Sequence, residues 1–234
     1  MDKKIREAQL EVLKIFSTTT ETFALAGGTA LELYYLHHRF SVDLDFFSPQ
    51  YNLKEINKLV SGFKKYSGSI KFEAEFVAKG RARVRFYIVP VKGADRPLKI
   101  DFMEDVVFEN PEIKEFNKVP VYSAENIYLQ KILAITGAEF IEDDIGRFHT
   151  QGRNQARDVF DLYMLSKKIC ELHIFLRKQS SQIKRGIVHW YQIFSRQDIL
   201  LALLDLDIYD KSFDARKMII YLEEEVKKFI REEL

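Results

Sequence analysis

The feature of this sequence that most constrains its fold is a short segment, residues 42–47, in which apolar residues alternate with two aspartates. Side chains at positions i and i+2 of a β-strand lie on the same face, so Asp43 and Asp45 are predicted to project together. The opposite, packed face is then apolar and carries Val42, Leu44 and Phe46. Two neighbouring carboxylates repel each other and are costly to bury, and a hard cation that prefers oxygen ligands relieves that repulsion. The segment is therefore either a metal-binding strand or an exposed strand face that carries two aspartates by chance.

A third aspartate stands in a similar alternating segment. Leu98, Ile100 and Phe102 share one face of a predicted strand, which leaves Asp101 on the other face. If this strand lies beside residues 42–47, partners across the two strands have Cβ atoms ~5 Å apart. Asp101 would then complete a carboxylate cluster for two metal ions and accept the proton of an attacking hydroxyl.

A glycine pair precedes the first two acids. The apolar run 23–26 stops at Gly27 and Gly28, and residues 29–36 resume with a helical pattern. A strand, a glycine turn and a helix start can bring backbone N–H groups against a phosphate, where Thr29 would add a hydroxyl donor. The alternative is a tight turn with no ligand, and the nearby acids favour a joint metal–triphosphate site.

After Glu104 in this chain of 234 residues the strand-like pattern ends. Asn110-Pro111 and Val119-Pro120 interrupt a stretch that is predicted to be a connection, and from residue 124 onward the pattern is almost wholly helical. Ser123 is predicted to cap a helix over 124–135, with Glu125 in its first turn. The predicted fold class is α+β, with a mixed sheet and helices in residues 1–118 and an α-helical lobe in residues 119–234. Other predicted elements are helices at 5–16 and 52–66 and strands at 70–77, 82–91 and 98–103.

Composition excludes several classes of protein. The formal net charge is +1, so the chain is not generally polybasic, and Cys170 is the only cysteine, so an intrachain disulfide and a cysteine-rich zinc site are impossible. The five histidines lack zinc-ligand spacing. No apolar run approaches the ~20 residues of a membrane span, so we expect a cytoplasmic protein with no membrane partner.

These motifs occur in an order that resembles a known family. Gly27-Gly28-Thr29-Ala30-Leu31, then His38-Arg39-x-Ser41-x-Asp43-Leu44-Asp45, then Asp101 resemble the nucleotidyltransferases of the polymerase-β-like superfamily. More narrowly, they resemble the AbiEii-type abortive-infection toxins of type IV toxin–antitoxin systems. The resemblance implies that a nucleoside triphosphate is held by Gly27, Gly28, Thr29 and Ser41. It also implies that two Mg²⁺ ions, or Mn²⁺ in their place, are bound by the three catalytic acids Asp43, Asp45 and Asp101.

The helical half resembles the later motifs of the same family, a Lys-x-x-Ala helix and an Arg-Asp-x-x-Asp-Leu helix. By this resemblance Lys131 would contact the triphosphate, and the nucleotide side of the cleft would be ordered by Arg157, Asp158 and Asp161. The structural alternative is that Arg157 and Asp161, four residues apart, form a pair on the helix surface.

Arginines alternate with apolar residues in the strand predicted at 82–91 and just before it. Arg81, Arg83 and Arg85 would line one face, which is either an ordinary solvated surface or a stripe that steers an RNA backbone. His38 and Arg39 are expected to brace the strand that leads to Asp43.

The resemblance implies Mg²⁺-dependent transfer of a nucleotide from an NTP to an acceptor hydroxyl, with release of pyrophosphate. The expected acceptor is RNA, most plausibly the 3′ end of tRNA, and the expected setting is a toxin with a cognate antitoxin gene product. The alternative is a catalytically idle fold that binds RNA or protein, although all three acids and the glycine pair are retained. The D-x-D motif of a glycosyltransferase or phosphatase is disfavoured by the upstream glycine pair and by the missing Thr after Asp45.

Overall fold

The computed structural model describes residues 2–77, 82–137, 140–142, 148–150, 152–153 and 155–233. The chain forms two compact units, which are described separately below. Unit 1 comprises Met1–Tyr35 and Phe40–Asn126, and unit 2 comprises Leu36–Arg39 and Ile127–Leu234. The predicted division into an α/β domain of residues 1–118 and a helical domain of residues 119–234 stays a prediction. Within the described residues, no helix is both long enough and apolar enough to cross a membrane.

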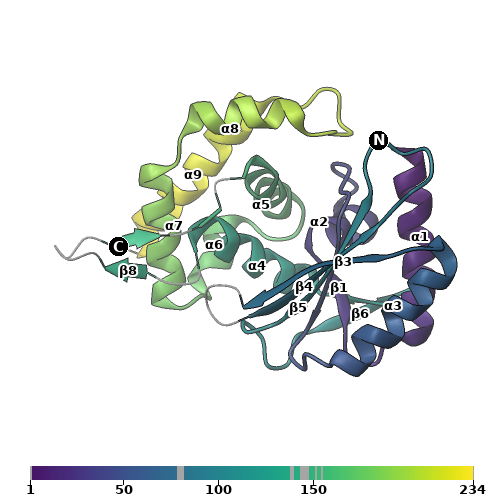
Figure 1. The fold of residues 1–234 in the computed structure, drawn as a ribbon. Helices are drawn as coiled ribbons and strands as arrows, with labels where there is room; N and C mark the ends of the chain where they lie inside the picture. Colours follow the sequence, from purple (N-terminus) through teal and green to yellow (C-terminus); the bar gives the residue numbers. More distant parts are fainter. Residues whose placement is uncertain are drawn as a thin grey trace. The chain divides into compact units, whose positions relative to one another are not determined.

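Unit 1 is built on a mixed seven-stranded sheet with the strand order β3-β4-β5-β2-β1-β7-β6 (Figure 1). Its strands are β1 Ala24–Ala26, β2 Leu44–Ser48, β3 Lys71–Val77, β4 Arg83–Val89, β5 Leu98–Glu104, β6 Ile113–Phe116 and β7 Val119–Tyr122. Its helices are α1 Lys3–Thr19, α2 Gly27–Ala30, the π-helical segment η1 Leu31–Leu36, α3 Leu53–Ser67 and the start of α4 Ala124–Thr136. The expected α+β class is therefore confirmed.

The apolar face of the central strands packs against α1 and α3, which run side by side (Figure 1). Phe46 of β2 stacks on Phe16 of α1 with ring centroids 4.1 Å apart, and it also contacts Phe63 of α3 and Phe102 of β5. At Gly62 a Cβ would lie 2.9 Å from Ile15 Cγ2, so this glycine allows the two helices to approach closely. The predicted apolar faces of 42–47 and 98–102 therefore form the core, and their acids lie on the opposite face.

The hairpin of β6 and β7 was not expected, because Pro111 and Pro120 made residues 110–120 read as a connection. In the structure Asn117 and Lys118 both have positive φ, 50° and 69°, as in the two-residue turns that join hairpin strands. β7 then pairs in parallel with β1, and Leu25 faces Val121. The predicted helix at 29–36 also differs, since it is a single α turn followed by the π-helical segment.

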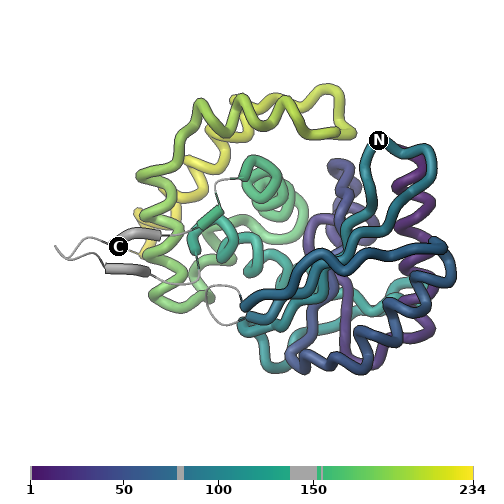
Figure 2. The backbone as a smooth tube through the Cα atoms, viewed as in Figure 1, coloured from purple at the N-terminus to yellow at the C-terminus, as the bar shows by residue number. Residues whose placement is uncertain are grey.

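Unit 2 is helical apart from one small hairpin. It contains the rest of α4, then β8 Phe140–Glu142 and β9 Phe148–Thr150, and the helices α5 Ala156–Lys168, α6 Leu172–Arg177, α7 Ser181–Ile193, α8 Arg196–Ala202, η2 Leu203–Asp205 and α9 Ala215–Glu233. Figure 2 shows the long α9 tube, in yellow, alongside α7. The predicted cap of α4 is confirmed, because the Asn126 N–H donates to Ser123 Oγ at 3.2 Å.

Candidate active site

Two of the predicted acids face each other across neighbouring strands of unit 1. β2 and β5 pair in parallel, and Asp45 stands directly opposite Asp101 in the register. The expectation that these two strands are neighbours is therefore confirmed. Asp43 precedes the first residue of β2, and its charge is near enough to contribute to the raised pKa of Asp101.

The surroundings of Asp101 oppose its ionised form. The residue is 5% exposed, and burial, followed by the charge of Asp45, raises the pKa of Asp101 to about 7. Its Oδ1 is buried without a hydrogen-bond partner among the described residues. A buried carboxylate oxygen without a hydrogen-bond partner, next to a second carboxylate, destabilises the folded protein when it is ionised. A bound cation would offset this cost.

Lys99 partly compensates this charge, and the sequence reading missed it. Its Nζ donates to Asp101 Oδ2 at 2.9 Å and lies 4.2 Å from the centre of the Phe86 ring. The hydrogen bond lowers the pKa of Asp101 and so counteracts part of the effect of burial. The signal was present, because residues 99 and 101 stand at i and i+2 of one predicted strand and must share a face.

The glycine turn lies directly against this pair of acids. Gly27 has a φ of +69°, and a Cβ at this position would overlap the Asp45 carboxylate. Only glycine allows both the left-handed backbone and the close approach. Thr29 is fully buried and its hydroxyl donates to the Asp43 carbonyl oxygen, so here it positions Asp43. The roles of Gly27, Gly28 and Thr29 in binding a triphosphate stay predictions.

The backbone just before Asp43 is fixed by buried polar side chains. The Ser41 N–H donates to Glu32 Oε2 at 2.8 Å, and the Ser41 carbonyl accepts from Gln9 Nε2 at 2.9 Å. Glu32 is itself 2% exposed and pairs with Arg6. Ser41 is thus part of a rigid support for the acids, while its predicted contact with a nucleotide is untested. The support residues Gln9 and Glu32 gave no signal in the sequence.

The three predicted acids do not form a three-ligand metal site in the part of the chain that the structure describes. Among the described residues, no three His, Cys, Asp or Glu side chains are arranged to hold a metal ion. The acids form an opposed pair, Asp45 and Asp101, with Asp43 nearby. Because Mg²⁺ keeps several waters and needs only one or two protein carboxylates, the pair and its buried Oδ1 fit a divalent cation.

Three of the predicted residues of unit 2, Lys131, Asp158 and Asp161, belong to a buried ionic cluster centred on Asp161. Arg39 binds its carboxylate with two hydrogen bonds, from Nε to Oδ1 at 2.7 Å and from Nη2 to Oδ2 at 2.8 Å. His38 Nε2 lies 2.8 Å from Oδ1, and Lys131 Nζ lies 2.8 Å from Oδ2. Asp161 is fully buried, so the alternative of a surface pair with Arg157 is wrong.

Charge balance keeps this cluster ionised. Burial opposes the charge of Asp161, but Arg39 and Lys131 outweigh it and hold the pKa of Asp161 well below its usual range. Lys131 Nζ also donates to Asp158 Oδ1 at 2.7 Å. Burial lowers the pKa of Lys131, and the two aspartates more than reverse that effect.

His38 and Arg39, which were expected to brace the strand before Asp43, are both bound to Asp161. The sequence did not indicate this partner, because Asp161 lies more than a hundred residues further along the chain. Arg157 Nε donates to the side chain of Gln155 at 2.8 Å. The predicted contacts of Lys131, Arg157, Asp158 and Asp161 with a nucleotide stay predictions.

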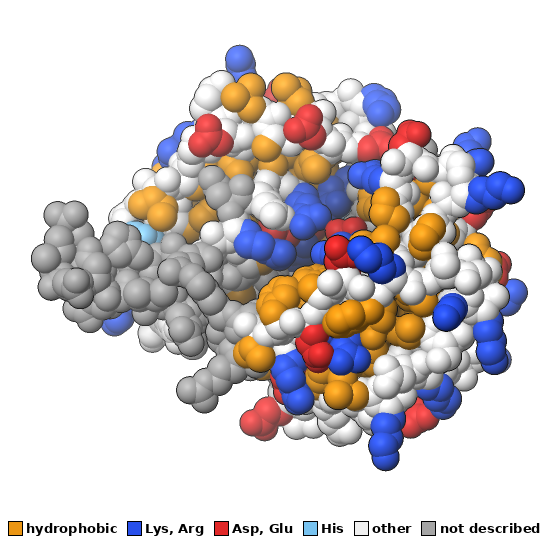
Figure 3. All heavy atoms as spheres, viewed as in Figure 1, with side chains coloured by type: hydrophobic (Ala, Val, Ile, Leu, Met, Phe, Trp, Pro, Cys, Tyr) orange, Lys and Arg blue, Asp and Glu red, His pale blue; other side chains and the backbone are white. Residues whose placement is uncertain are grey.

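The arginine stripe is engaged in ion pairs. Arg83 binds Glu104 with its Nε at 2.9 Å, and Arg85 Nη2 binds Glu75 at 2.7 Å. Arg81 lies outside the described residues. Around β3 and β4, Figure 3 shows hydrophobic side chains mixed with basic and acidic ones. The paired state favours the reading of an ordinary solvated face.

Comparison with known proteins supports a nucleotidyltransferase fold. A candidate nucleotidyltransferase from Helicobacter pylori is 19% identical over 98% of this chain and 96% of its own, with a TM-score of 0.60. The structure of JHP933 from Helicobacter pylori is 19% identical over 99% of this chain and 95% of its own, with a TM-score of 0.62. No curated protein is significantly similar in sequence.

The family comparison is more specific. The profile of the nucleotidyl transferase AbiEii toxin family, of type IV toxin–antitoxin systems, matches residues 11–218. That range contains the glycine turn, the three acids and the buried cluster around Asp161. The chain therefore belongs to the AbiEii nucleotidyltransferase toxin family.

Proposed function

We propose that this protein transfers a nucleotide from an NTP to an acceptor hydroxyl and releases pyrophosphate. The observation that carries the proposal is the facing pair Asp45 and Asp101, in which Asp101 Oδ1 is buried with no hydrogen-bond partner among the described residues. In the reaction, a bond forms between the acceptor oxygen and the α-phosphorus. The bond from that phosphorus to the pyrophosphate oxygen breaks.

The cation in this proposal is Mg²⁺, or Mn²⁺ in its place, held by Asp45 and Asp101 with Asp43 nearby. When bound, it offsets the negative charge of the acids and of the triphosphate. The chain itself supplies a rigid support, because Gly27 fits against Asp45 and Thr29 holds the Asp43 carbonyl.

Asp101 is the proposed acceptor of the proton from the attacking hydroxyl. A base works best when its pKa is near the working pH, and burial beside Asp45 raises the pKa of Asp101 to about 7. Lys99 keeps the ionised form accessible by donating to Oδ2.

The remaining assignments rest on the family resemblance. Gly27, Gly28, Thr29 and Ser41 are proposed to hold the triphosphate together with Lys131. Arg157, Asp158 and Asp161 of α5 are proposed to order the nucleotide. The proposed acceptor is an RNA end, most plausibly the 3′ end of tRNA, and the family supports a cognate antitoxin gene product as partner. Because Arg83 and Arg85 are paired with glutamates, the stripe adds no support for RNA.

The test is transfer of label from each α-labelled NTP, with Mg²⁺ and either total tRNA or no RNA. We expect one NTP to label tRNA, and both Asp45→Ala and Asp101→Asn to abolish the labelling. Asp95→Ala is the matched control, because Asp95 is an exposed aspartate on the turn before β5. Labelling of the protein in the absence of RNA would refute the RNA acceptor, and unchanged transfer by folded Asp45→Ala would refute the site.

A further inference from the structure

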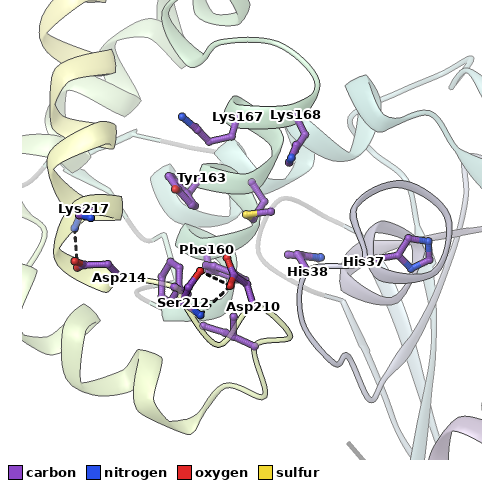
Figure 4. Close-up of a pocket in the computed structure, with 13 residues that line it drawn as sticks. His37, His38, Phe160, Tyr163, Lys167, Lys168, Asp210, Ser212, Asp214 and Lys217 are labelled. Carbon is purple, nitrogen blue, oxygen red and sulfur yellow. Dashed lines mark hydrogen bonds between the residues drawn. The ribbon is translucent and has the colours of Figure 1, made fainter.

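Unit 2 contains a cavity of about 440 Å³ that none of the residues of the acid pair lines. It lies between α5 and residues 208–214, which lead into α9, and the short segment 36–39 contributes His37 and His38 (Figure 4). The volume falls within the ~300–1,000 Å³ typical of small-molecule sites. Every lining residue belongs to unit 2.

One wall of the cavity is aromatic. Phe160 and Phe213 pack edge to face with ring centroids 4.9 Å apart, and Tyr163 lies next to both. The His38 ring stacks on Phe160 at 5.5 Å. Phe160 is 1% exposed, whereas Tyr163 and Phe213 are partly exposed, so a flat aromatic ligand such as a nucleobase would stack on the latter two rings.

The rim of the cavity offers positive charge. Lys167 and Lys168, at the end of α5, line it; Lys167 lies 4.7 Å from the Tyr221 ring centre. Neither lysine forms an ion pair with a residue that the structure describes. An anionic group would therefore find ammonium groups that the protein has not already neutralised.

The two acids of the lining are already engaged in holding the backbone. Asp210 Oδ1 accepts from the N–H of Ser212 at 2.8 Å and from its hydroxyl at 2.6 Å, as the dashed lines in Figure 4 show. Asp214 Oδ1 accepts from the N–H groups of Arg216 and Lys217 at the start of α9. Both carboxylates thus stabilise the wall rather than pair with the lysines.

His38, one of the lining residues, also has a buried ring nitrogen. His38 is 3% exposed, and because a carboxylate only accepts, its Nε2 carries the hydrogen shared with Asp161. In the tautomer that carries its hydrogen on Nε2, Nδ1 is an acceptor, and it is buried with no partner among the described residues. It would be satisfied by an amino or hydroxyl group of a ligand.

We propose that this cavity binds a nucleotide, with its phosphate at Lys167 and Lys168, its base on the aromatic wall and a donor group at His38 Nδ1. A nucleotide carries all three of the groups that the cavity would recognise: an anionic phosphate, a flat aromatic base and a hydrogen-bond donor. The nucleotide is either free or the terminal residue of an RNA strand, since both present the same chemistry. The inference goes beyond the proposed transfer, because the cavity uses none of Asp43, Asp45 and Asp101.

The first experiment measures the affinity of the full chain for AMP by calorimetry, in EDTA so that metal-dependent NTP binding does not contribute. We expect AMP to bind clearly more tightly than either adenosine or inorganic phosphate. Lys168→Glu should weaken AMP binding about tenfold or more, as expected for loss of a charge-assisted contact. Lys178→Glu is the matched control, because Lys178 is an exposed lysine of the same unit outside the cavity.

Equal affinity for AMP in Lys168→Glu and wild type, or no binding of AMP, would overturn the proposal. Two analogues test the acceptor on His38: 2′-deoxy-AMP, which lacks one hydroxyl, and IMP, which lacks the amino group. At least one should bind several-fold more weakly than AMP, and equal binding by both would contradict the role of Nδ1.

The second experiment identifies the source and separates this site from the proposed active site. Tighter binding of a six-nucleotide single-stranded RNA than of AMP, with a salt slope of ~0.7 per phosphate contact, assigns the RNA end; equal binding assigns the free nucleotide. Asp45→Ala should retain AMP binding in EDTA whether or not it retains transfer. Loss of AMP binding in that variant would place the nucleotide at the acid pair and refute the cavity.

Discussion

At the scale of single residues, the facing carboxylates of Asp45 and Asp101 make the metal-free protein less stable at neutral pH. The charge of Asp45 is the second largest cause, after burial, of the raised pKa of Asp101. Asp45→Asn should therefore raise the free energy of unfolding at pH 8 in EDTA, because it removes the charge that opposes the ionised form of Asp101. Nucleotide transfer should vanish in the same variant. Chemical denaturation checks the first effect, and the exposed Asp95→Asn should change neither property.

Lys99 gives a second prediction at this scale. Its hydrogen bond lowers the pKa of Asp101, so Lys99→Met should raise that pKa further. In EDTA, the titration profile of the Asp101 carboxyl, followed by NMR, should then shift to higher pH. Lys92→Met, a change of an exposed lysine in the turn before β5, should leave the profile unmoved. A profile that shifts downward in Lys99→Met would contradict this role.

At the scale of elements, the turn between β1 and α2 has to fit against β2. Gly27→Ala places a methyl group where the Asp45 carboxylate lies and forces a non-glycine residue to a φ of +69°. Gly68 is a matched control, because its φ is +75° but nothing lies within 4 Å of its added Cβ. Both variants should lose the ~1–2 kcal/mol that left-handed backbone costs an L-residue. Only Gly27→Ala should lose transfer as well, and equal activity of the two folded variants would show that the fit is unimportant.

The elements also show how far sequence reasoning reaches. Alternation over 42–47 and 98–102 predicted two strands with acids on one face, because the side-chain period of a strand is local. The hairpin of β6 and β7 was missed, because proline usually interrupts a strand and lysine rarely adopts a positive φ. Asp161 was assigned to a nucleotide by resemblance, and its buried partners Arg39 and His38 could not be read from spacing, since the contact spans 122 residues.

At the scale of the whole molecule, the chain does not divide at one point. The four residues Leu36–Arg39 belong to the compact unit that begins again at Ile127. Within that unit, Arg39 and His38 are fixed to Asp161, and a buried charge that loses its partner costs ~3–5 kcal/mol. These ionic contacts therefore fix the segment Leu36–Arg39, which lies shortly before Ser41 and Asp43 in the sequence. A prediction based on contiguous ranges, 1–118 and 119–234, has no way to include such a segment.

The two units should respond to pH in opposite directions. Asp101 has a raised pKa, so the stability it contributes is complete below its unfolded pKa of about 4 and is lost as the pH rises through about 7. Asp161 and Asp158 have lowered pKa values, so their contribution is present above about pH 4 and is lost as the pH falls below it. In EDTA the unfolding temperature should therefore be highest at about pH 4 and should decline from there to about pH 7.

Each limb of that profile should depend on one unit. Asp45→Asn should flatten the decline between about pH 4 and 7, because it removes the charge that faces Asp101, and Mg²⁺ should flatten the same limb if the acids hold it. Asp161→Asn should flatten the decline at low pH and lower stability at pH 7 by ~3–5 kcal/mol, since Arg39 and Lys131 then lose a buried counter-charge. Thermal unfolding from pH 3 to 9, with and without Mg²⁺, measures all four effects. An acidic limb that persists unchanged in Asp161→Asn would assign it to other carboxylates, and a neutral limb unaffected by Asp45→Asn would mean that the raised pKa of Asp101 does not arise from the facing acid.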